Sequence, residues 1–440
     1  MVTTELSRFD PLVCRVGVSD SQERAILVFD YSRKDYDLSS SEFVSLAVSA
    51  GAYICGSIRT TRGRADTKTF ITLGKLDELK SLVESECASV VIVESQISPV
   101  QERNLQTALN CRVIDRVRLI LDIFALRART REGKLQVELA QLKHLSTRLV
   151  RGWTHLERQR GGIGLRGPGE TQLETDRRLI GIRLKKLRKQ LDSVQSQRQL
   201  HRRRRQRKPI PLISLVGYTN SGKSSLFNRL TNSNVYVADQ LFATLDPTIR
   251  RIELQGYGPL LLSDTVGFVR KLPHTLIEAF RATLEEVRES QLLVHVVDTS
   301  ESDFREHIEE VEEVLKEIGA CEIPRVIVFN KIDLTGELPR VQKSTNGQDV
   351  KIWLSAATGA GLDLMHQVFL EQIASEHRVR RLRLGIESGR SRARIYQLAE
   401  VRTEAVDQDG NYLLDVYVDR ATEGRLNALF ESDRGLSWVG

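Results

Sequence analysis

The sequence predicts an α/β protein with four parts. They are an N-terminal α/β domain (1–130), an antiparallel helical coiled-coil arm (131–207), a doubly wound α/β domain with a phosphate-binding loop (209–376) and a small C-terminal α+β domain (377–440). Three observations predict this organisation. Short apolar runs alternate with helical stretches, as in α/β proteins. Leucines recur at helical spacing in a basic stretch, and a glycine-rich turn joins an apolar run to a helix at 213–225.

Composition bounds the class of protein. With 440 residues and 40% hydrophobic content, several domains can each bury a core, and the net charge of +7 favours a polyanionic partner. The five cysteines are scattered without a C-x-x-C pair, which indicates thiols in a reducing cytoplasm, not a disulfide framework or a zinc site. Residues 1–13 do not resemble a signal peptide, and the longest apolar runs are too short to cross a bilayer. We therefore expect a soluble, cytoplasmic monomer.

The first region is expected to form a largely parallel sheet. Strands are predicted at residues 25–29, 70–73, 90–93 and 111–114, and helices at 76–86, 100–109 and 118–127. Its sequence has no phosphate loop and no metal-ligand spacing. Asp115 and Arg116 follow a strand end, where α/β proteins place their sites, but a capping and salt-bridging role is favoured for both.

Two stretches of the arm carry apolar residues on one helical face. The first seam is Leu135, Leu139, Leu142 and Leu149, and the second is Ile180, Leu184, Leu187, Leu191 and Val194. Two such helices joined by a loop fit an antiparallel coiled-coil hairpin, although the same periodicity suits two ordinary core helices. Pro209 and Pro211 then mark a domain boundary.

The loop between these helices and the second helix itself are basic. Five glycines between Gly161 and Gly169 are interspersed with Arg158, Arg160 and Arg166. Such a loop suits close approach to folded RNA, whereas a passive linker needs no arginines. From Arg177 to Lys208 the second helix carries many Lys and Arg and a single acid, Asp192. A solvated face usually mixes charges, so this stretch indicates salt-dependent binding to nucleic acid.

The glycine-rich turn matches G-x-x-x-x-G-K-[ST] between a strand and a helix at residues 224–230. Its backbone N–H groups are expected to surround a phosphate chain, with Lys223 reaching the β- and γ-phosphates and Ser224 ligating Mg²⁺. The predicted loop residues are Gly217, Tyr218, Thr219, Asn220, Ser221, Gly222, Lys223 and Ser224.

The other parts of a guanine-nucleotide switch follow in order. An irregular loop holds Phe242, Ala243, Thr244, Leu245 and Asp246, and both Thr244 and Thr248 could close over Mg²⁺ and the γ-phosphate. A strand then ends in D-x-x-G at Asp264, Thr265, Val266 and Gly267, where Asp264 can hold Mg²⁺ through water and the Gly267 N–H can bond the γ-phosphate. Phe268 occupies the position where many GTPases carry a water-orienting glutamine, so slow intrinsic hydrolysis with stimulation by a partner is expected.

Base recognition is predicted from N-K-x-D at Asn330, Lys331, Ile332 and Asp333. The Asp333 carboxylate can accept from N1–H and the 2-amino group of guanine; adenine lacks both donors, so ATP should be rejected. Ser355, Ala356 and Ala357 end a further strand, and the Ser355 and Ala356 backbone can touch the base O6. In the C-terminal region, strands are expected at 394–401 and 412–418 around a turn at 407–410, followed by a helix at 422–430.

Together these features resemble the HflX family of translational GTPases over most of the chain. The marks are RARTREGKLQVELAQ at 127–141, GGIGLRGPGETQ at 161–172, FATLDP at 242–247 and DTVGFVR at 264–270. The resemblance implies a catalytic set of Lys223, Thr244 and Gly267, with Mg²⁺ held by Ser224 and Thr244. Ile249 stands where a second threonine is common, which leaves Thr244 unaffected.

The resemblance also implies a function. It implies a GTP/GDP switch that binds the large ribosomal subunit and its rRNA, brings the glycine-rich loop near the peptidyl-transferase region, and splits or rescues stalled ribosomes under stress. Two alternatives stay open. One is a GTPase in ribosome assembly or RNA modification. The other is a signalling switch with only protein partners, for which the basic arm would be unnecessary.

Overall fold

A computed structural model describes residues 23–30, 36–60, 68–152, 168–205, 210–232, 241–255, 257–270, 281–344, 350–385, 387–432 and 436–439. The contacts group the chain into two compact units. The first comprises Met1–Leu191, Ala238–Leu245 and Arg270–Phe280, and the second comprises Asp192–Val237, Asp246–Val269 and Arg281–Gly440. The glycine- and arginine-rich loop of the arm lies outside the described residues from 153 to 167.

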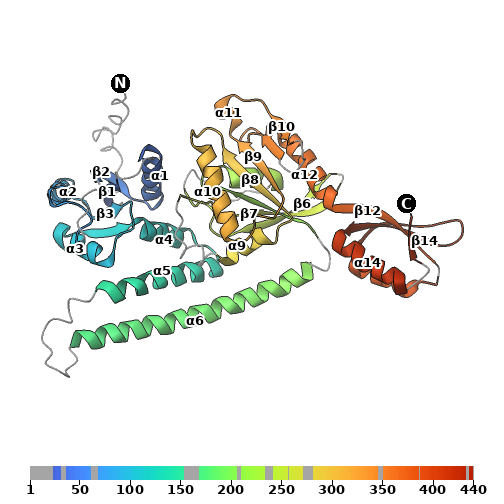
Figure 1. The fold of residues 1–440 in the computed structure, drawn as a ribbon, viewed down its shortest axis with the longest axis horizontal. Coiled ribbons are helices and arrows are strands. Elements are labelled where there is room, and N and C mark those ends of the chain that lie inside the picture. The colour runs from blue at the N-terminus through green and yellow to red at the C-terminus, as the bar shows by residue number, and fades with distance from the viewer. Residues whose placement is uncertain are drawn as a thin grey trace. The chain divides into compact units, whose positions relative to one another are not determined.

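The first unit contains a parallel sheet in the order β2-β1-β3-β4 (Figure 1). Its strands are β1 (Arg24–Asp30), β2 (Tyr53–Thr60), β3 (Val90–Val93) and β4 (Arg112–Asp115), and its helices are α1 (Tyr36–Ser49), α2 (Leu73–Ser85), α3 (Pro99–Leu109) and α4 (Arg116–Arg127). Strand β3 is buried along its whole length, as an inner parallel strand should be. Helix α3 begins at a capping box of Ser98 and Gln101 with Pro99 in its first turn, which satisfies its first N–H groups.

One predicted strand of this region is wrong. Phe70 and Ile71 lie in a turn before α2, and Phe70 has φ 67°, which no strand residue adopts. Both side chains are buried in the domain core, which explains their apolar character without a strand. The fourth strand of this sheet is instead β2, which pairs with β1 at the edge of the sheet, where polar residues and Gly56 weaken the apolar pattern.

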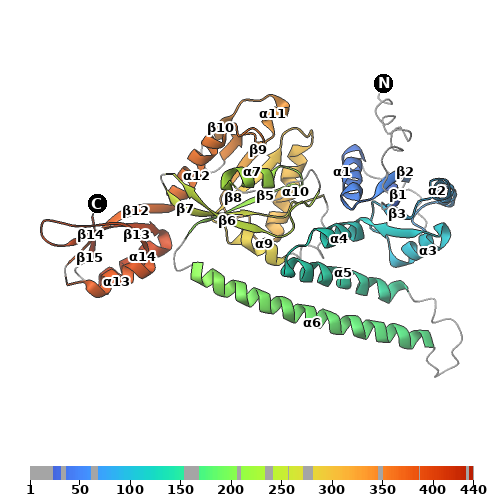
Figure 2. The same ribbon diagram turned by 180° about the vertical axis from the view of Figure 1, so that it is seen from behind.

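The arm residues form two helices, α5 (Arg131–Gly152) and α6 (Pro168–Arg205), which lie side by side over part of their length (Figures 1 and 2). Leu139, Leu187 and Leu191 are buried together, with Leu135, Leu142 and Leu184 packed against them. An ion pair between Arg183 and Glu138 also joins the helices. The leucine spacing therefore reflects a shared apolar seam.

The second unit contains a seven-stranded sheet in the order β10-β11-β9-β8-β5-β7-β6. The strands are β5 (Leu212–Gly217), β6 (Thr248–Leu254), β7 (Gly258–Asp264), β8 (Leu292–Asp298), β9 (Arg325–Asn330), β10 (Arg340–Lys343) and β11 (Val350–Trp353). Strands β6 and β10 run antiparallel to their neighbours, and the inner strands are parallel.

Helices cover both faces of this sheet (Figures 1 and 2). Apolar residues of α7 (Lys223–Thr231) and α12 (Leu362–Glu376) join the core on one face, while α9 (Arg281–Arg288) and α10 (Phe304–Glu317) lie on the other. A short helix α11 (Ile332–Thr335) follows β9. This doubly wound arrangement brings the carboxyl ends of β5, β8 and β9 together, where nucleotides bind in such folds.

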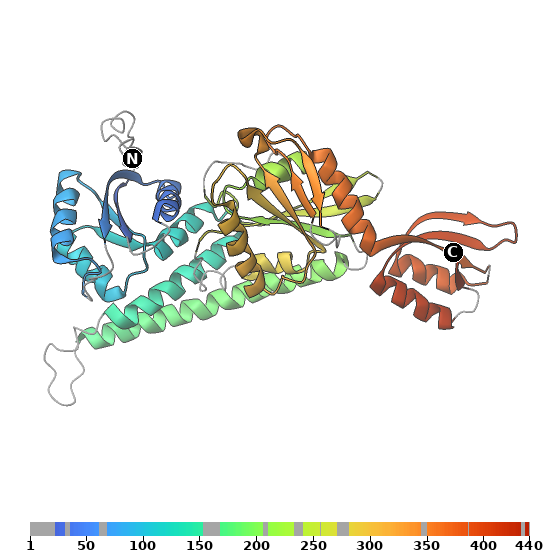
Figure 3. The same cartoon turned by 45° about the horizontal axis from the view of Figure 1, so that its top comes forward.

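The C-terminal residues form an antiparallel sheet in the order β13-β14-β12-β15. Its strands are β12 (His377–Leu384), β13 (Glu400–Val406), β14 (Tyr412–Asp419) and β15 (Leu436–Val439), with α13 (Gly389–Leu398) and α14 (Arg420–Ser432) on one face, as Figure 3 shows in red. The predicted strand at 394–401 is wrong, because residues up to Leu398 belong to α13. Its alternation of charged and apolar residues fits either period over so short a run. The predicted turn before β14 is present, with Gly410 at φ 84°.

Candidate nucleotide-binding site

The glycine-rich turn joins β5 to α7 and requires glycine at two positions. Gly217 has φ 148°, and a Cβ there would lie 2.2 Å from the Val296 carbonyl oxygen of the neighbouring strand. Gly222 has φ 90°, and a Cβ there would lie 2.2 Å from Nδ2 of Asn330. Any larger residue at Gly222 therefore displaces the first residue of the N-K-x-D motif.

Lys223 is held in place by the loop that precedes it. Its Nζ donates to the carbonyl oxygens of Gly217, at 3.1 Å, and Tyr218, at 2.5 Å, and the side chain is buried. Burial lowers the pKa of Lys223 to about 8, and the nearby Asp264 carboxylate opposes that shift. The ammonium is thus positioned before any phosphate arrives, at a cost that an anion would offset.

Ser224 and Asp264 meet at the end of β7. The Ser224 hydroxyl donates to Oδ2 of Asp264 at 2.6 Å, and Asp264 is fully buried. The adjacent Thr265 hydroxyl donates to the Leu215 carbonyl at 2.6 Å, which ties the D-x-x-G strand to β5. A hydroxyl beside a carboxylate supplies the hard oxygen donors that suit Mg²⁺. Within the described ranges, no cluster of three or more His, Cys, Asp or Glu is arranged to hold a metal ion.

Gly267 and Phe268 lie directly against the phosphate loop. A Cβ on Gly267 would lie 2.7 Å from Cγ2 of Thr219 and 3.1 Å from Nζ of Lys223. The Phe268 N–H donates to the Gly217 carbonyl at 3.1 Å, and the Thr219 N–H donates to the Phe268 carbonyl at 2.8 Å. The Phe268 side chain is buried. Position 268 is therefore a backbone connection to the loop, and it presents no side-chain amide to a water molecule.

The N-K-x-D residues are fixed by partners from two other segments, the phosphate loop and residues 355–356. Asn330 donates from Nδ2 to the Ser221 carbonyl at 2.9 Å and accepts from the Ala356 N–H at 2.9 Å. The Ser355 hydroxyl donates to Oδ1 of Asp333 at 2.5 Å, which orients the carboxylate. The Ser355 N–H donates to the Ala360 carbonyl at 3.0 Å. Both amides expected to reach the base O6 thus already have protein acceptors.

Two residues that the motif analysis did not single out support this site. Asp298, at the end of β8, forms an ion pair with Lys331 at 2.5 Å and accepts from the Ser300 N–H. Its position at a strand end in the sequence was a usable signal. Arg229 of α7 donates to the Ala357 carbonyl at 2.6 Å, and nothing in the sequence pattern pointed to that contact.

Thr244, the predicted switch threonine, belongs to a different compact unit from the phosphate-loop residues. Thr244 lies in an irregular segment in which Phe242 and Leu245 are buried, and residues 241–245 group with the first unit. Its expected contact with Mg²⁺ stays a prediction. Thr248 begins β6 and lies opposite Asp264 in the strand register, so it belongs to regular structure.

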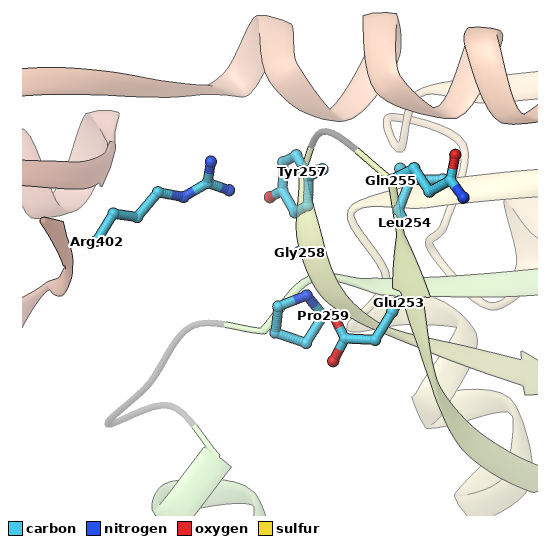
Figure 4. A pocket seen from close by; sticks show the side chains of 7 residues that line it. All are labelled: Glu253, Leu254, Gln255, Tyr257, Gly258, Pro259 and Arg402. Carbon is cyan, nitrogen blue, oxygen red and sulfur yellow. The ribbon is translucent and has the colours of Figure 1, made fainter.

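A separate pocket of about 410 Å³ lies at the β6–β7 turn (Figure 4). Tyr257, Gly258 and Pro259 line it together with Arg402 of β13. Because β7 runs from Gly258 to Asp264, this pocket is at the opposite end of the strand from the nucleotide motifs. It is not the nucleotide site.

Family models match three parts of this chain. Residues 37–125 match a family model described as GTP-binding GTPase N-terminal, residues 127–205 match the GTP-binding GTPase middle region, and residues 212–331 match a model described as 50S ribosome-binding GTPase. The chain is 51% identical over 399 residues to GTPase HflX of Escherichia coli K12, covering 90% of this chain and 94% of that protein. The chain belongs to the HflX family of GTPases.

A second HflX relative and one solved structure are also similar to this chain. GTPase HflX of Caldanaerobacter subterraneus subsp. tengcongensis is 44% identical over 397 residues, covering 90% of this chain and 91% of its own. Among solved structures, a GTP-binding protein from Sulfolobus solfataricus in complex with GDP is 25% identical, with a TM-score of 0.43 over 80% of this chain and 99% of its own. As a member of the HflX family, the protein is a GTP hydrolase, which converts GTP to GDP and phosphate. None of the helices in the described residues is long and apolar enough to span a membrane.

The lowered pKa of Lys223 gives this HflX protein a testable pH dependence. Bound phosphate favours the charged ammonium of Lys223. GDP binding therefore takes up a proton at any pH at which Lys223 is neutral in the nucleotide-free protein. We expect the affinity for GDP to be constant below the lysine pKa of about 8 and to fall as pH rises through it. The limiting slope is about tenfold per pH unit. Titration with a fluorescent GDP at pH values below the titration of the guanine N1 proton measures this, with thermal unfolding at each pH as the control. A constant affinity over that range contradicts the prediction.

Proposed function

We propose that this protein is a GTP-dependent switch that binds the large ribosomal subunit and splits or rescues stalled ribosomes under stress. The observation that carries the proposal is the combination of a preformed guanine-nucleotide site with a long basic helix. The name of the matching family model, 50S ribosome-binding GTPase, supports the choice of partner. The protein is proposed to act in the cytoplasm as a monomer, with the four-part domain division given above.

The nucleotide roles follow from the site. We assign Lys223 to the β- and γ-phosphates, the Gly267 N–H to the γ-phosphate and Asp333 to the guanine edge. Ser224 and Thr244 would hold Mg²⁺, with Asp264 behind a water ligand. The ion would neutralise charge on the phosphates. The hydrogen bonds to Asn330 and Asp333 preorganise the base site, so guanine binds without first ordering those side chains.

Hydrolysis is proposed to be slow until the ribosome is bound. Phe268 is buried and its backbone pairs with the phosphate loop, so it cannot orient the attacking water. The group that does so must come from another part of the chain or from the large subunit. Stimulation by large subunits is the expected consequence.

Helix α6 supplies the surface for rRNA. Lys185, Lys186, Arg188 and Lys189 are all exposed on it, whereas Leu187 between them is buried against α5. The apolar seam holds the helix in the arm and leaves the cationic side chains facing solvent. Each cation that neutralises a phosphate releases a counterion, so the salt dependence of binding reports the number of contacts.

Co-sedimentation with purified large subunits tests the proposal. We expect binding with a non-hydrolysable GTP analogue to exceed binding with GDP, or without nucleotide, by about tenfold or more. Replacing Lys185, Lys186, Arg188 and Lys189 by glutamine should reduce the slope of log affinity against log salt by up to about 3. Lys80→Gln with Lys316→Gln, two exposed lysines elsewhere, is the matched control and should leave the slope unchanged. Equal binding in all nucleotide states refutes the proposal, and preference for assembly precursors over mature subunits points to ribosome assembly instead.

A further inference from the structure

Residues 241–245, which include Thr244, and Arg270, which follows the D-x-x-G motif, group with the N-terminal domain. These are the chain segments expected to respond to the γ-phosphate. The N-terminal domain therefore contacts both of them directly.

The first segment is anchored through Phe242. Its ring meets that of Phe124 edge-on, with centroids 4.5 Å apart and an interplanar angle of 76°, and Phe242 is 2% exposed. Phe242 has φ 56°, a conformation that is strained for a bulky residue and persists only where its surroundings impose it. The Leu241 N–H also donates to Oγ of Ser49 at 3.1 Å. The conformation two residues before Thr244 thus depends on the N-terminal domain.

The second segment is anchored through Arg270. Nη2 of Arg116 donates to the Arg270 carbonyl oxygen at 3.1 Å. Arg116 is itself buried and forms an ion pair with Glu42 of α1, which fixes the guanidinium. Arg270 lies two residues after Phe268, whose backbone pairs with the phosphate loop. A displacement of Phe268 therefore also displaces Arg270 and changes its contact with Arg116.

Phe124 and Arg116, which contact Phe242 and Arg270, both lie on α4, and the start of the same helix is tied to the arm. Asp115 caps α4 by accepting from the Arg118 N–H at 3.0 Å, and it accepts from Nη2 of Arg148 in α5 at 2.5 Å. Arg148 also pairs with Glu102 of α3. Asp115 is fully buried and Arg148 nearly so, so the contact joins two helices inside the domain. The capping and salt-bridging role expected for Asp115 and Arg116 is confirmed. Asp115 caps α4 and pairs with Arg148 of α5, whereas Arg116 pairs with Glu42 of α1.

We propose that α4 is the relay between the nucleotide switch segments and the arm. One helix receives Phe242 through Phe124 and Arg270 through Arg116, and passes a displacement to α5 through the Asp115–Arg148 pair. Because linkage is reciprocal, engagement of the arm by rRNA also changes the switch segments. The proposal rests on the switch function given above and adds the path by which the nucleotide state reaches the arm.

Hydrogen exchange on the whole protein tests the relay without a ribosome. In the unsubstituted protein, exchanging GDP for a non-hydrolysable GTP analogue should change protection in residues 116–127, 131–148 and 264–269. In Phe124→Leu the nucleotide-dependent change in protection of residues 131–148 should be at least about fivefold smaller than in the unsubstituted protein. Fivefold is the lower end of typical allosteric coupling. The change in protection of residues 264–269 should be retained. Ser49→Ala, which removes the acceptor of the Leu241 N–H and leaves the core intact, should have the same effect more weakly.

Phe43→Leu is the matched control. Phe43 of α1 is fully buried and meets Phe29 of β1 edge-on at 5.6 Å, so its replacement weakens packing in the same domain at a ring pair other than Phe124–Phe242. It should lower thermal stability as Phe124→Leu does and leave the nucleotide-dependent exchange unchanged. If Phe124→Leu does not fold, Ser49→Ala carries the test alone.

Co-sedimentation separates this inference from the proposed function. Nucleotide-independent large-subunit binding by the unsubstituted protein refutes the proposed function. The relay predicts that Phe124→Leu and Ser49→Ala reduce the ratio of GTP-analogue to GDP affinity for large subunits, and that Phe43→Leu does not. Retention of the full exchange changes in 131–148 by both Phe124→Leu and Ser49→Ala overturns the relay, whatever the ribosome result.

Discussion

Asp333→Asn is expected to weaken GTP binding by about two to four orders of magnitude, because two charge-assisted hydrogen bonds to guanine are lost. The Ser355 hydroxyl, which donates to Oδ1 of Asp333 at 2.5 Å, should hold the amide oxygen in the same place. The amide NH₂ then faces the base. Xanthine carries a carbonyl where guanine carries the 2-amino group, so this variant should bind XTP more tightly than the unsubstituted protein does. Competition of XTP and GTP against a fluorescent nucleotide measures both changes.

Asp298→Asn provides the matched comparison for this prediction. Asp298 forms an ion pair with Lys331 and is not assigned to the guanine edge. Its replacement should therefore weaken the binding of GTP and of XTP equally. Stability should fall by only about 1 kcal/mol, as for a partly exposed hydrogen-bonded pair. An unchanged preference for GTP over XTP in Asp333→Asn means that Asp333 does not read the base.

Gly222→Ala is expected to reduce affinity for GDP and GTP by at least about a hundredfold, by displacing a base-site residue and straining the loop. The added Cβ lies 2.2 Å from Nδ2 of Asn330, which cannot stay bonded to Ser221. The left-handed φ of 90° adds about 1–2 kcal/mol of backbone strain. Isothermal titration with GDP and thermal unfolding measure the two consequences separately.

Gly424→Ala is the control within the same unit. Gly424 lies in α14 with nothing within 4 Å of an added Cβ. Alanine there should raise stability by about 0.5–1 kcal/mol and leave nucleotide affinity unchanged. If Gly222→Ala binds GDP as tightly as Gly424→Ala does, the phosphate loop does not have the geometry described above.

Sequence reasoning was most successful where a motif is local. The strand, turn and helix around Gly217–Ser224 are present as expected, and the elements ending at Asp264 and Asn330 are the predicted strands. It failed at Phe70–Leu73 and at 394–401. Both are short runs in which burial against a distant element, and not a repeating pattern, decides the conformation.

The supporting residues of the site were harder to find for the same reason. Asp298 and Lys331 are 33 positions apart and meet only because β8 and β9 are neighbours in the sheet. Arg229 reaches Ala357 across more than a hundred residues. Periodicity and motif spacing carry no information about which strands become adjacent.

The sequence by itself determined the guanine-nucleotide chemistry, because glycine freedom, a lysine, a hydroxyl and a carboxylate at short fixed spacings suffice to specify it. It also determined that α6 is basic on its exposed side and apolar on its buried side. Only the tertiary structure decided that Phe242 and Arg270 contact α4, through Phe124 and Arg116. Those contacts join segments separated by more than a hundred positions, and folding of the whole domain brings them together.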